Sequence, residues 1–146
     1  MRAFVVIVVL CLSYAVVHAC KCSKPSVASA AAQAKLVFVG TITKQHEAKS
    51  CAPNHPTWCR SSFTYDVSVE GVFKGTVDKA VTVDAGHGRG DCSPGALAKK
   101  VEGSRWLFFT STAKQPLFIH MCGGTQRATD KAIAAVTKKL GAAKAP

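Results

Sequence analysis

The chain has 146 residues, of which 19 are Lys or Arg and 8 are Asp or Glu, so its formal net charge is +11 at pH 7. A hydrophobic content of 48% and a charged content of only 18% exclude intrinsic disorder for most of the chain. A chain of this length suits one domain with a buried core and is too short for a large multi-domain enzyme.

Residues 1–19 have the pattern of a cleaved secretory signal peptide. An arginine gives a positive start, an apolar stretch runs from Phe4 to Leu12, and the small residues Val17 and Ala19 occupy positions −3 and −1 before the cleavage site. A membrane anchor is the alternative, but the apolar stretch is shorter than the roughly 20 residues that a membrane-spanning helix needs. We therefore expect a secreted, extracellular protein that begins at Cys20 and does not insert into membranes.

The first half of the remaining chain predicts one helix and two strands. Residues 25–34 are rich in alanine and begin with a proline, which is typical of a short helix. Residues 35–44 are largely β-branched and apolar and predict a strand, which its single glycine is expected to bend. Residues 45–61 contain two prolines and an asparagine and predict a long loop. Apolar and polar residues alternate over residues 62–73, which predict a second strand with a kink at its glycine.

The second half predicts three shorter strands and a helix. The strands are expected at residues 80–83, 105–110 and 116–122. Residues 84–95 form a glycine-rich loop, residues 128–140 have the apolar spacing and the end charges of a helix, and residues 141–146 are expected to be a flexible tail. Together these elements predict a mainly β fold, a five-stranded and partly open OB-like barrel, in a single domain over residues 20–140.

The cysteines indicate disulfide bonds. Of the seven cysteines, Cys11 would leave with the signal peptide, and an even number would remain. These are Cys20, Cys22, Cys51, Cys59, Cys92 and Cys122. In an oxidising compartment they predict three disulfide bonds with several possible pairings, and secretion makes metal ligation the weaker alternative. Cys20 and Cys22 are too close to pair with each other, whereas Cys51 and Cys59 can close a loop locally.

The order of these features resembles that of a known family. A predicted signal peptide ends before Cys20-Lys21-Cys22, and an alanine-rich helix leads into the strands LVFVG and FTYDVSVEGVFKG. Asp91-Cys92 then follows a glycine-rich loop, and a later strand after RWLFFT ends in Cys122-Gly123-Gly124. This order is similar to that of the netrin-type (NTR) module. The Cys-x-Cys start resembles the inhibitory domain of the tissue inhibitors of metalloproteinases, in their single-domain invertebrate form.

The resemblance implies the pairs Cys20–Cys92 and Cys22–Cys122 in a disulfide-stapled OB-like barrel. A third bridge of the family has no counterpart, because this sequence lacks cysteines at both of its positions. Cys51–Cys59 would be the remaining pair.

The resemblance also implies inhibition of zinc metalloproteinases of the matrix type. The catalytic zinc of such a protease has three protein ligands and one open position. The α-amino nitrogen and the carbonyl oxygen of Cys20 would chelate this zinc, since an α-amino pKa of about 8 makes the neutral amine accessible at neutral pH. Disulfide bonds at Cys20 and Cys22 would hold the terminus rigid before binding, which improves affinity.

Five further residues are assigned to protease binding by the resemblance: Lys21, Cys22, Ser23, Arg89 and Gly90. Lys21 would point towards the specificity pocket, Ser23 would continue along the cleft, and the Cys20–Cys92 bridge would hold Arg89 and Gly90 beside them. The family usually has Ser or Thr at the position of Lys21. The long stem of a lysine can place its charge in water beyond the pocket, or a shallow apolar pocket can reject it.

A binding module without inhibitory activity is the alternative. Arg89-Gly90-Asp91 spells the tripeptide that integrins recognise, and the positive charge favours heparan sulfate or other acidic matrix. A third hypothesis is a protein that keeps the scaffold of the family and has an unrelated effector role. In both cases Cys20 and Cys22 would be structural only.

Catalytic patterns are missing from the sequence, which predicts a protein that is not an enzyme. It contains no G-x-S-x-G, and no Lys-Ser or Lys-Thr follows the glycines of residues 86–90. His46, His55, His87 and His120 lack metal-ligand spacing. We expect a monomer with no cofactor of its own, the only zinc being that of the target protease, and no nucleic-acid partner.

Overall fold

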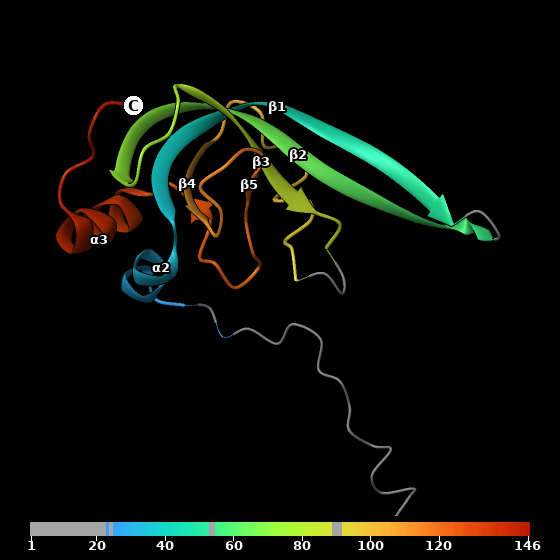
Figure 1. Ribbon diagram of the computed structural model, residues 1–146, viewed down its shortest axis with the longest axis horizontal. Coiled ribbons are helices and arrows are strands. Elements are labelled where there is room, and N and C mark those ends of the chain that lie inside the picture. Colours follow the sequence, from blue (N-terminus) through green and yellow to red (C-terminus); the bar gives the residue numbers. More distant parts are fainter. Residues whose placement is uncertain (1–22, 24, 53–54, 89–91) are drawn as a thin grey trace, which may run out of the picture.

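The computed structural model describes Ser23 and residues 25–52, 55–88 and 92–146. These residues form a mainly β structure, a mixed sheet of six strands with two helices (Figure 1). In chain order the elements are α2 (Val27–Gln33), β1 (Leu36–Ala52), β2 (His55–Lys74), β3 (Ala80–Gly86), β4 (Arg105–Thr110), β5 (Leu117–Phe118), β6 (Gln126–Arg127) and α3 (Asp130–Leu140). The mainly β class and the two helices agree with the sequence analysis, while β6 was not expected.

The strands follow the order β5-β3-β2-β1-β4-β6 across the sheet. All neighbours are antiparallel except β3 and β5, which are parallel. β5 is shorter than the strand expected at residues 116–122, but the chain after it keeps pairing. Ile119 forms a bridge with Thr110 at the end of β4, and Ser111 donates a backbone hydrogen bond of 3.1 Å to Phe118. The segment at β5 therefore contacts both β3 and the end of β4.

β1 and β2 form a hairpin that extends beyond the rest of the sheet as an arm (Figure 1). The prediction of a long loop at residues 45–61 is therefore wrong for most of that range, which lies in β1 and β2. Side chains link the two strands there: Cys51 and Cys59 are paired and disulfide-bonded, and Ser61 donates a hydrogen bond of 2.5 Å to a carboxylate oxygen of Glu47. Residues 46–50 are all exposed, so no apolar alternation marks this part of the strand in the sequence.

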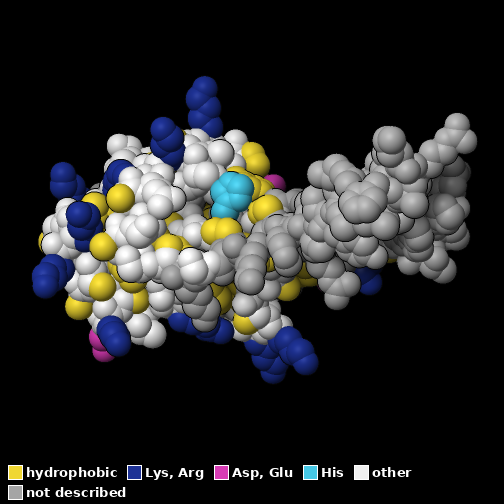
Figure 2. All heavy atoms as spheres, turned by 90° about the horizontal axis from the view of Figure 1, so that it is seen from below, with side chains coloured by type: hydrophobic (Ala, Val, Ile, Leu, Met, Phe, Trp, Pro, Cys, Tyr) yellow, Lys and Arg dark blue, Asp and Glu magenta, His cyan; other side chains and the backbone are white. Residues whose placement is uncertain are grey.

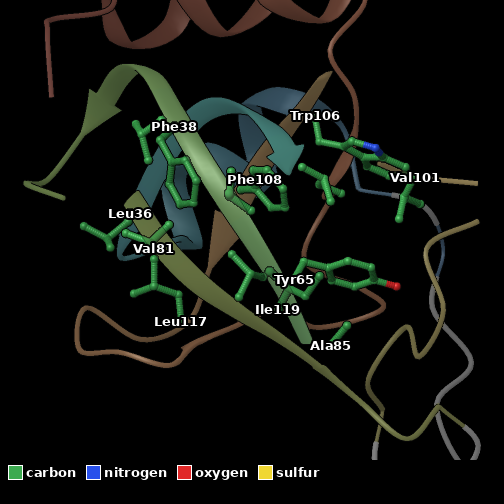
Figure 3. Packing of buried hydrophobic residues seen from close by; sticks show 14 of the residues in the cluster. Leu36, Phe38, Tyr65, Val81, Ala85, Val101, Trp106, Phe108, Leu117 and Ile119 are labelled. Carbon is green, nitrogen blue, oxygen red and sulfur yellow. The ribbon is translucent and has the colours of Figure 1, made fainter. Parts of the chain in front are cut away.

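Both faces of the central strands are covered. Leu36 and Phe38 of β1 belong to one buried cluster, whereas Val37 and Val39 belong to a second cluster that includes residues of α2 and α3. This explains why β1 begins as a nearly continuous apolar run. In the first cluster Phe38 stacks on Phe108 of β4 with ring centroids 5.0 Å apart (Figure 3).

The helix ends follow from capping. Ser26 and Thr129 accept backbone hydrogen bonds of 3.2 Å as the N-caps of α2 and α3, so each helix begins after its cap. Lys74 donates from Nζ to the carbonyl oxygens of Ala31 and Ala32 near the end of α2, at 3.0 and 3.1 Å. In the described part of the chain, neither helix has the length and apolar character needed to cross a membrane.

The tail after α3 is held on the sheet. Lys144 and Val72 exchange two backbone hydrogen bonds of 2.9 Å. A Cβ added to Gly71 would lie 2.9 Å from the Cβ of Ala143, so the tail packs closely on β2. Lys144 is thus hydrogen-bonded to β2 within residues 141–146, the segment that the sequence analysis expects to be a flexible tail.

Candidate functional site

Two cysteines far apart in the sequence lie on neighbouring segments. Cys92 and Cys122 are both disulfide-bonded. The backbone N–H of Met121 donates a hydrogen bond of 2.9 Å to the carbonyl oxygen of Cys92. This bond joins the loop after β3 to the turn after β5. We call Cys92, Met121 and Cys122 the cysteine edge.

The loop that carries Cys92 is held closed at its base. Gly95 donates a backbone hydrogen bond of 2.8 Å to Ala85 in β3, and Gly88 donates one of the same length to the hydroxyl of the buried Ser93. A Cβ on Gly95 would lie 3.2 Å from the N and Cα of Gly88, so the two backbones approach closely. Both glycines have positive φ, which few other residues adopt at low cost. The glycine-rich composition of this loop therefore serves a tight closure.

Tyr65 fixes the chain that follows this loop. Its side chain is fully buried, and its hydroxyl oxygen accepts a hydrogen bond of 2.9 Å from the backbone N–H of Leu97. Burial raises the pKa of this hydroxyl above its ordinary value, and the hydrogen bond from Leu97 opposes that rise. Figure 3 shows the ring at the border of the first core cluster, with the hydroxyl pointing away from the cluster.

The turn that carries Cys122 lies against the start of α2. Gly123 donates a backbone hydrogen bond of 2.9 Å to His120, which closes the turn. A Cβ added to Gly124 would lie 2.6 Å from the Cβ of Ala30 and 3.6 Å from Cγ of Pro25. The chain that leads into α2 is thus brought next to the chain that leaves Cys122. A hollow of about 220 Å³, lined in part by His120 and Cys122, adjoins this contact.

Most of the residues that the sequence analysis assigns to protease binding lie outside the described part of the chain. These are Cys20, Lys21, Cys22, Arg89 and Gly90, and Asp91 of the integrin-type tripeptide lies outside it as well. Ser23 is described and exposed. The pairs Cys20–Cys92 and Cys22–Cys122 stay predictions, whereas the pair Cys51–Cys59 is confirmed.

Met121 is a residue that the sequence analysis missed. Its side chain is 47% exposed, and it is the one large hydrophobic residue exposed among those that the structure describes. The run PLFIHMC resembles a buried strand, so the sequence has no local signal for an exposed methionine at this position.

The basic side chains do not gather into one patch on the face in Figure 2, where Lys and Arg are spread around the rim. Two of the arginines already have partners. Arg105 donates from Nε to Glu70 at 2.6 Å, and Arg127 lies 5.0 Å above the ring of Trp106. Within the described ranges, no group of three or more His, Cys, Asp or Glu residues is placed to hold a metal ion.

The chain matches no model of a known protein family. No curated protein is significantly similar to it.

Proposed function

We propose that this protein is a secreted inhibitor of zinc metalloproteinases, in which the α-amino nitrogen and the carbonyl oxygen of Cys20 bind the catalytic zinc of the protease. One observation carries the proposal: Cys92 and Cys122 are both disulfide-bonded and lie on segments joined by the hydrogen bond from Met121 to Cys92. Two neighbouring anchors suit two partner cysteines that are separated by one residue, as Cys20 and Cys22 are.

The spacing of a Cys-x-Cys segment supports this pairing. Residues i and i+2 of an extended chain are about 7 Å apart, so a single short segment can reach two anchors on adjacent loops. The contact between Gly124 and the chain entering α2 brings the N-terminal side of the helix towards the same region. A first residue held by two such bonds would lose little conformational freedom when its amine and carbonyl bind zinc.

Several contacts hold the loop that carries Cys92. Buried Ser93, the close approach of Gly88 and Gly95, and the bond between Tyr65 and Leu97 fix the loop of Cys92. Affinity improves when a binding segment is already ordered, because less entropy is lost on docking. A short N-terminal segment attached to this loop would therefore be ordered before it binds zinc, which supports the proposed chelation.

We also propose that β1 to β5 form an OB-like barrel. In support, these five strands are neighbours in the sheet order β5-β3-β2-β1-β4-β6, and an isolated bridge between Thr110 and Ile119 brings the end of β4 next to the chain after β5. An NTR-type module of this kind would leave the cysteine edge at one end of the barrel, with the loop after β3 and the turn after β5.

The test is a titration of matrix metalloproteinases with the oxidised protein that begins at Cys20. A second protein carries one alanine before Cys20, and a control carries one alanine after Pro146. We expect stoichiometric inhibition by the first protein and the control. The N-terminal alanine should weaken inhibition by at least about a hundredfold, because it removes the free amine from Cys20. Equal thermal stability of all three proteins would show that the fold is intact.

Undiminished inhibition by the N-terminally extended protein would refute zinc chelation. An absence of inhibition by all three oxidised proteins would refute the inhibitor and favour the alternative NTR-type binding module. Retention on heparin that fades with salt would then support an electrostatic matrix-binding role, and cell adhesion that depends on Arg89-Gly90-Asp91 would support integrin binding.

A further inference from the structure

Met121 is displayed at a fixed place on the cysteine edge. Its backbone N–H is bonded to Cys92, and it lies in the turn that the bond from Gly123 to His120 closes. Single exposed apolar side chains are common on protein surfaces, so exposure alone carries no argument. The position of Met121 does carry an argument, because this exposed residue is next to Cys122 and its backbone N–H is hydrogen-bonded to Cys92.

The protein has only two methionines, and Met1 lies in the predicted signal peptide. Met121 would therefore be the sole methionine of the chain that begins at Cys20. A methionine thioether is flexible and apolar, and oxidation converts it into a polar sulfoxide that methionine sulfoxide reductases can reverse. Any change caused by methionine oxidation in this chain would thus come from one known position.

We propose that Met121 is an oxidation site that controls binding of the protease at the cysteine edge, an inference that rests on the proposed inhibitory function. The oxidant is a peroxide. The thioether sulfur attacks one peroxide oxygen, an S–O bond forms as the O–O bond breaks, and the second oxygen leaves as water after proton transfer. The sulfur is oxidised by two electrons, and the peroxide is reduced by two.

The sulfoxide weakens docking because its oxygen needs hydrogen bonds that an apolar contact does not supply. The turn cannot easily move the sulfoxide away from the contact, since its backbone is bonded to Cys92 and closed at Gly123. We expect the inhibition constant to rise about tenfold, which corresponds to about 1.4 kcal/mol of binding free energy.

The experiment compares the oxidised-disulfide protein that begins at Cys20 with its Met121→Leu variant. Leucine keeps an apolar side chain of similar volume and has no thioether. Both proteins are treated with dilute hydrogen peroxide, the added oxygen is located by peptide mapping, and the inhibition constant is measured before and after. The parent protein should gain one oxygen at Met121 and inhibit about tenfold less well, and a methionine sulfoxide reductase should restore it. Met121→Leu should inhibit equally before and after peroxide.

An oxygen added at Met121 with no change in inhibition would overturn the inference. So would an equal loss of inhibition in Met121→Leu, or a Met121 that stays reduced under conditions that oxidise a methionine in a short peptide. A lack of inhibition by both proteins before any peroxide is a different result, because it refutes the proposed inhibitor and this regulation with it.

Discussion

The variant Tyr65→Phe removes one hydroxyl from the core and keeps the ring that fills the space. Tyr65 is fully buried, and its hydroxyl is the acceptor for the backbone N–H of Leu97 at 2.9 Å. Phenylalanine leaves that part-buried N–H without this acceptor. Leaving a buried donor unsatisfied costs about 1 to 3 kcal/mol, and we expect the free energy of unfolding to fall by that amount.

Urea unfolding of the parent protein, Tyr65→Phe and a control measures this cost. Thr43→Val is the matched control, because it also removes a hydroxyl, one that donates an exposed hydrogen bond of 3.1 Å to the backbone oxygen of Asp66. Water can replace that bond, so the control should stay within about 0.5 kcal/mol of the parent protein. If Tyr65→Phe were as stable as Thr43→Val, the hydroxyl would not be what holds Leu97.

The same residue predicts a loss of stability in alkali. Burial raises the pKa of Tyr65 in the folded state, so the contribution of the neutral hydroxyl is fully present below the unfolded pKa of about 10. It is lost as the pH rises from there through the higher folded pKa. The other tyrosine, Tyr14, lies in the predicted signal peptide, so tyrosinate absorbance of the chain from Cys20 follows Tyr65 alone. Titration of the folded protein at the ordinary tyrosine pKa would contradict this reasoning.

Two further variants test the contacts of the fold. Gly124→Ala should destabilise the fold by about 1 to 3 kcal/mol more than Gly103→Ala. Both glycines have positive φ, but only a Cβ at residue 124 would meet a side-chain carbon of α2, at 2.6 Å. Equal melting temperatures of the two variants would refute this contact. Burial acts to raise the pKa of Glu70, but hydrogen bonds from a threonine and from Arg105 outweigh it and hold this pKa below its usual value. The contribution of ionised Glu70 to the free energy of unfolding is therefore present above its ordinary pKa of about 4.3 and is lost as the pH falls through the folded pKa. Glu70→Gln should make the stability fall less steeply in acid. Urea unfolding midpoints measured over that pH range test this expectation.

The central strands and the helices could be read from the sequence because each has a local signal. The expected strand at residues 105–110 coincides with β4, whose apolar run reflects burial on both faces. α3 ends at Leu140 before Gly141, as the expected helix did, and begins two residues later than expected because Thr129 is its cap.

The strands of the arm and the pairing of the tail with β2 could not be predicted from local sequence signals. Residues 46–51 of β1 are exposed, so pairing between the strands and the Cys51–Cys59 bond define this part of the arm instead of an apolar pattern. The tail is defined by backbone bonds between Lys144 and Val72, which lie far apart in the chain. Hydrogen bonds between such distant residues produce no local sequence pattern from which they could be predicted.

The sequence by itself determined the chemistry that is available: the number of cysteines, the Cys20-Lys21-Cys22 start that a cleaved signal peptide would expose, and the positive charge. Tertiary structure decided which of these groups meet. The bond from Met121 to Cys92 brings together two segments from different parts of the chain, and it also leaves the Met121 side chain exposed beside Cys122. The reason is physical: residue type and local spacing set the chemistry and the helix or strand preference, while contacts between distant residues exist only once the sheet has paired.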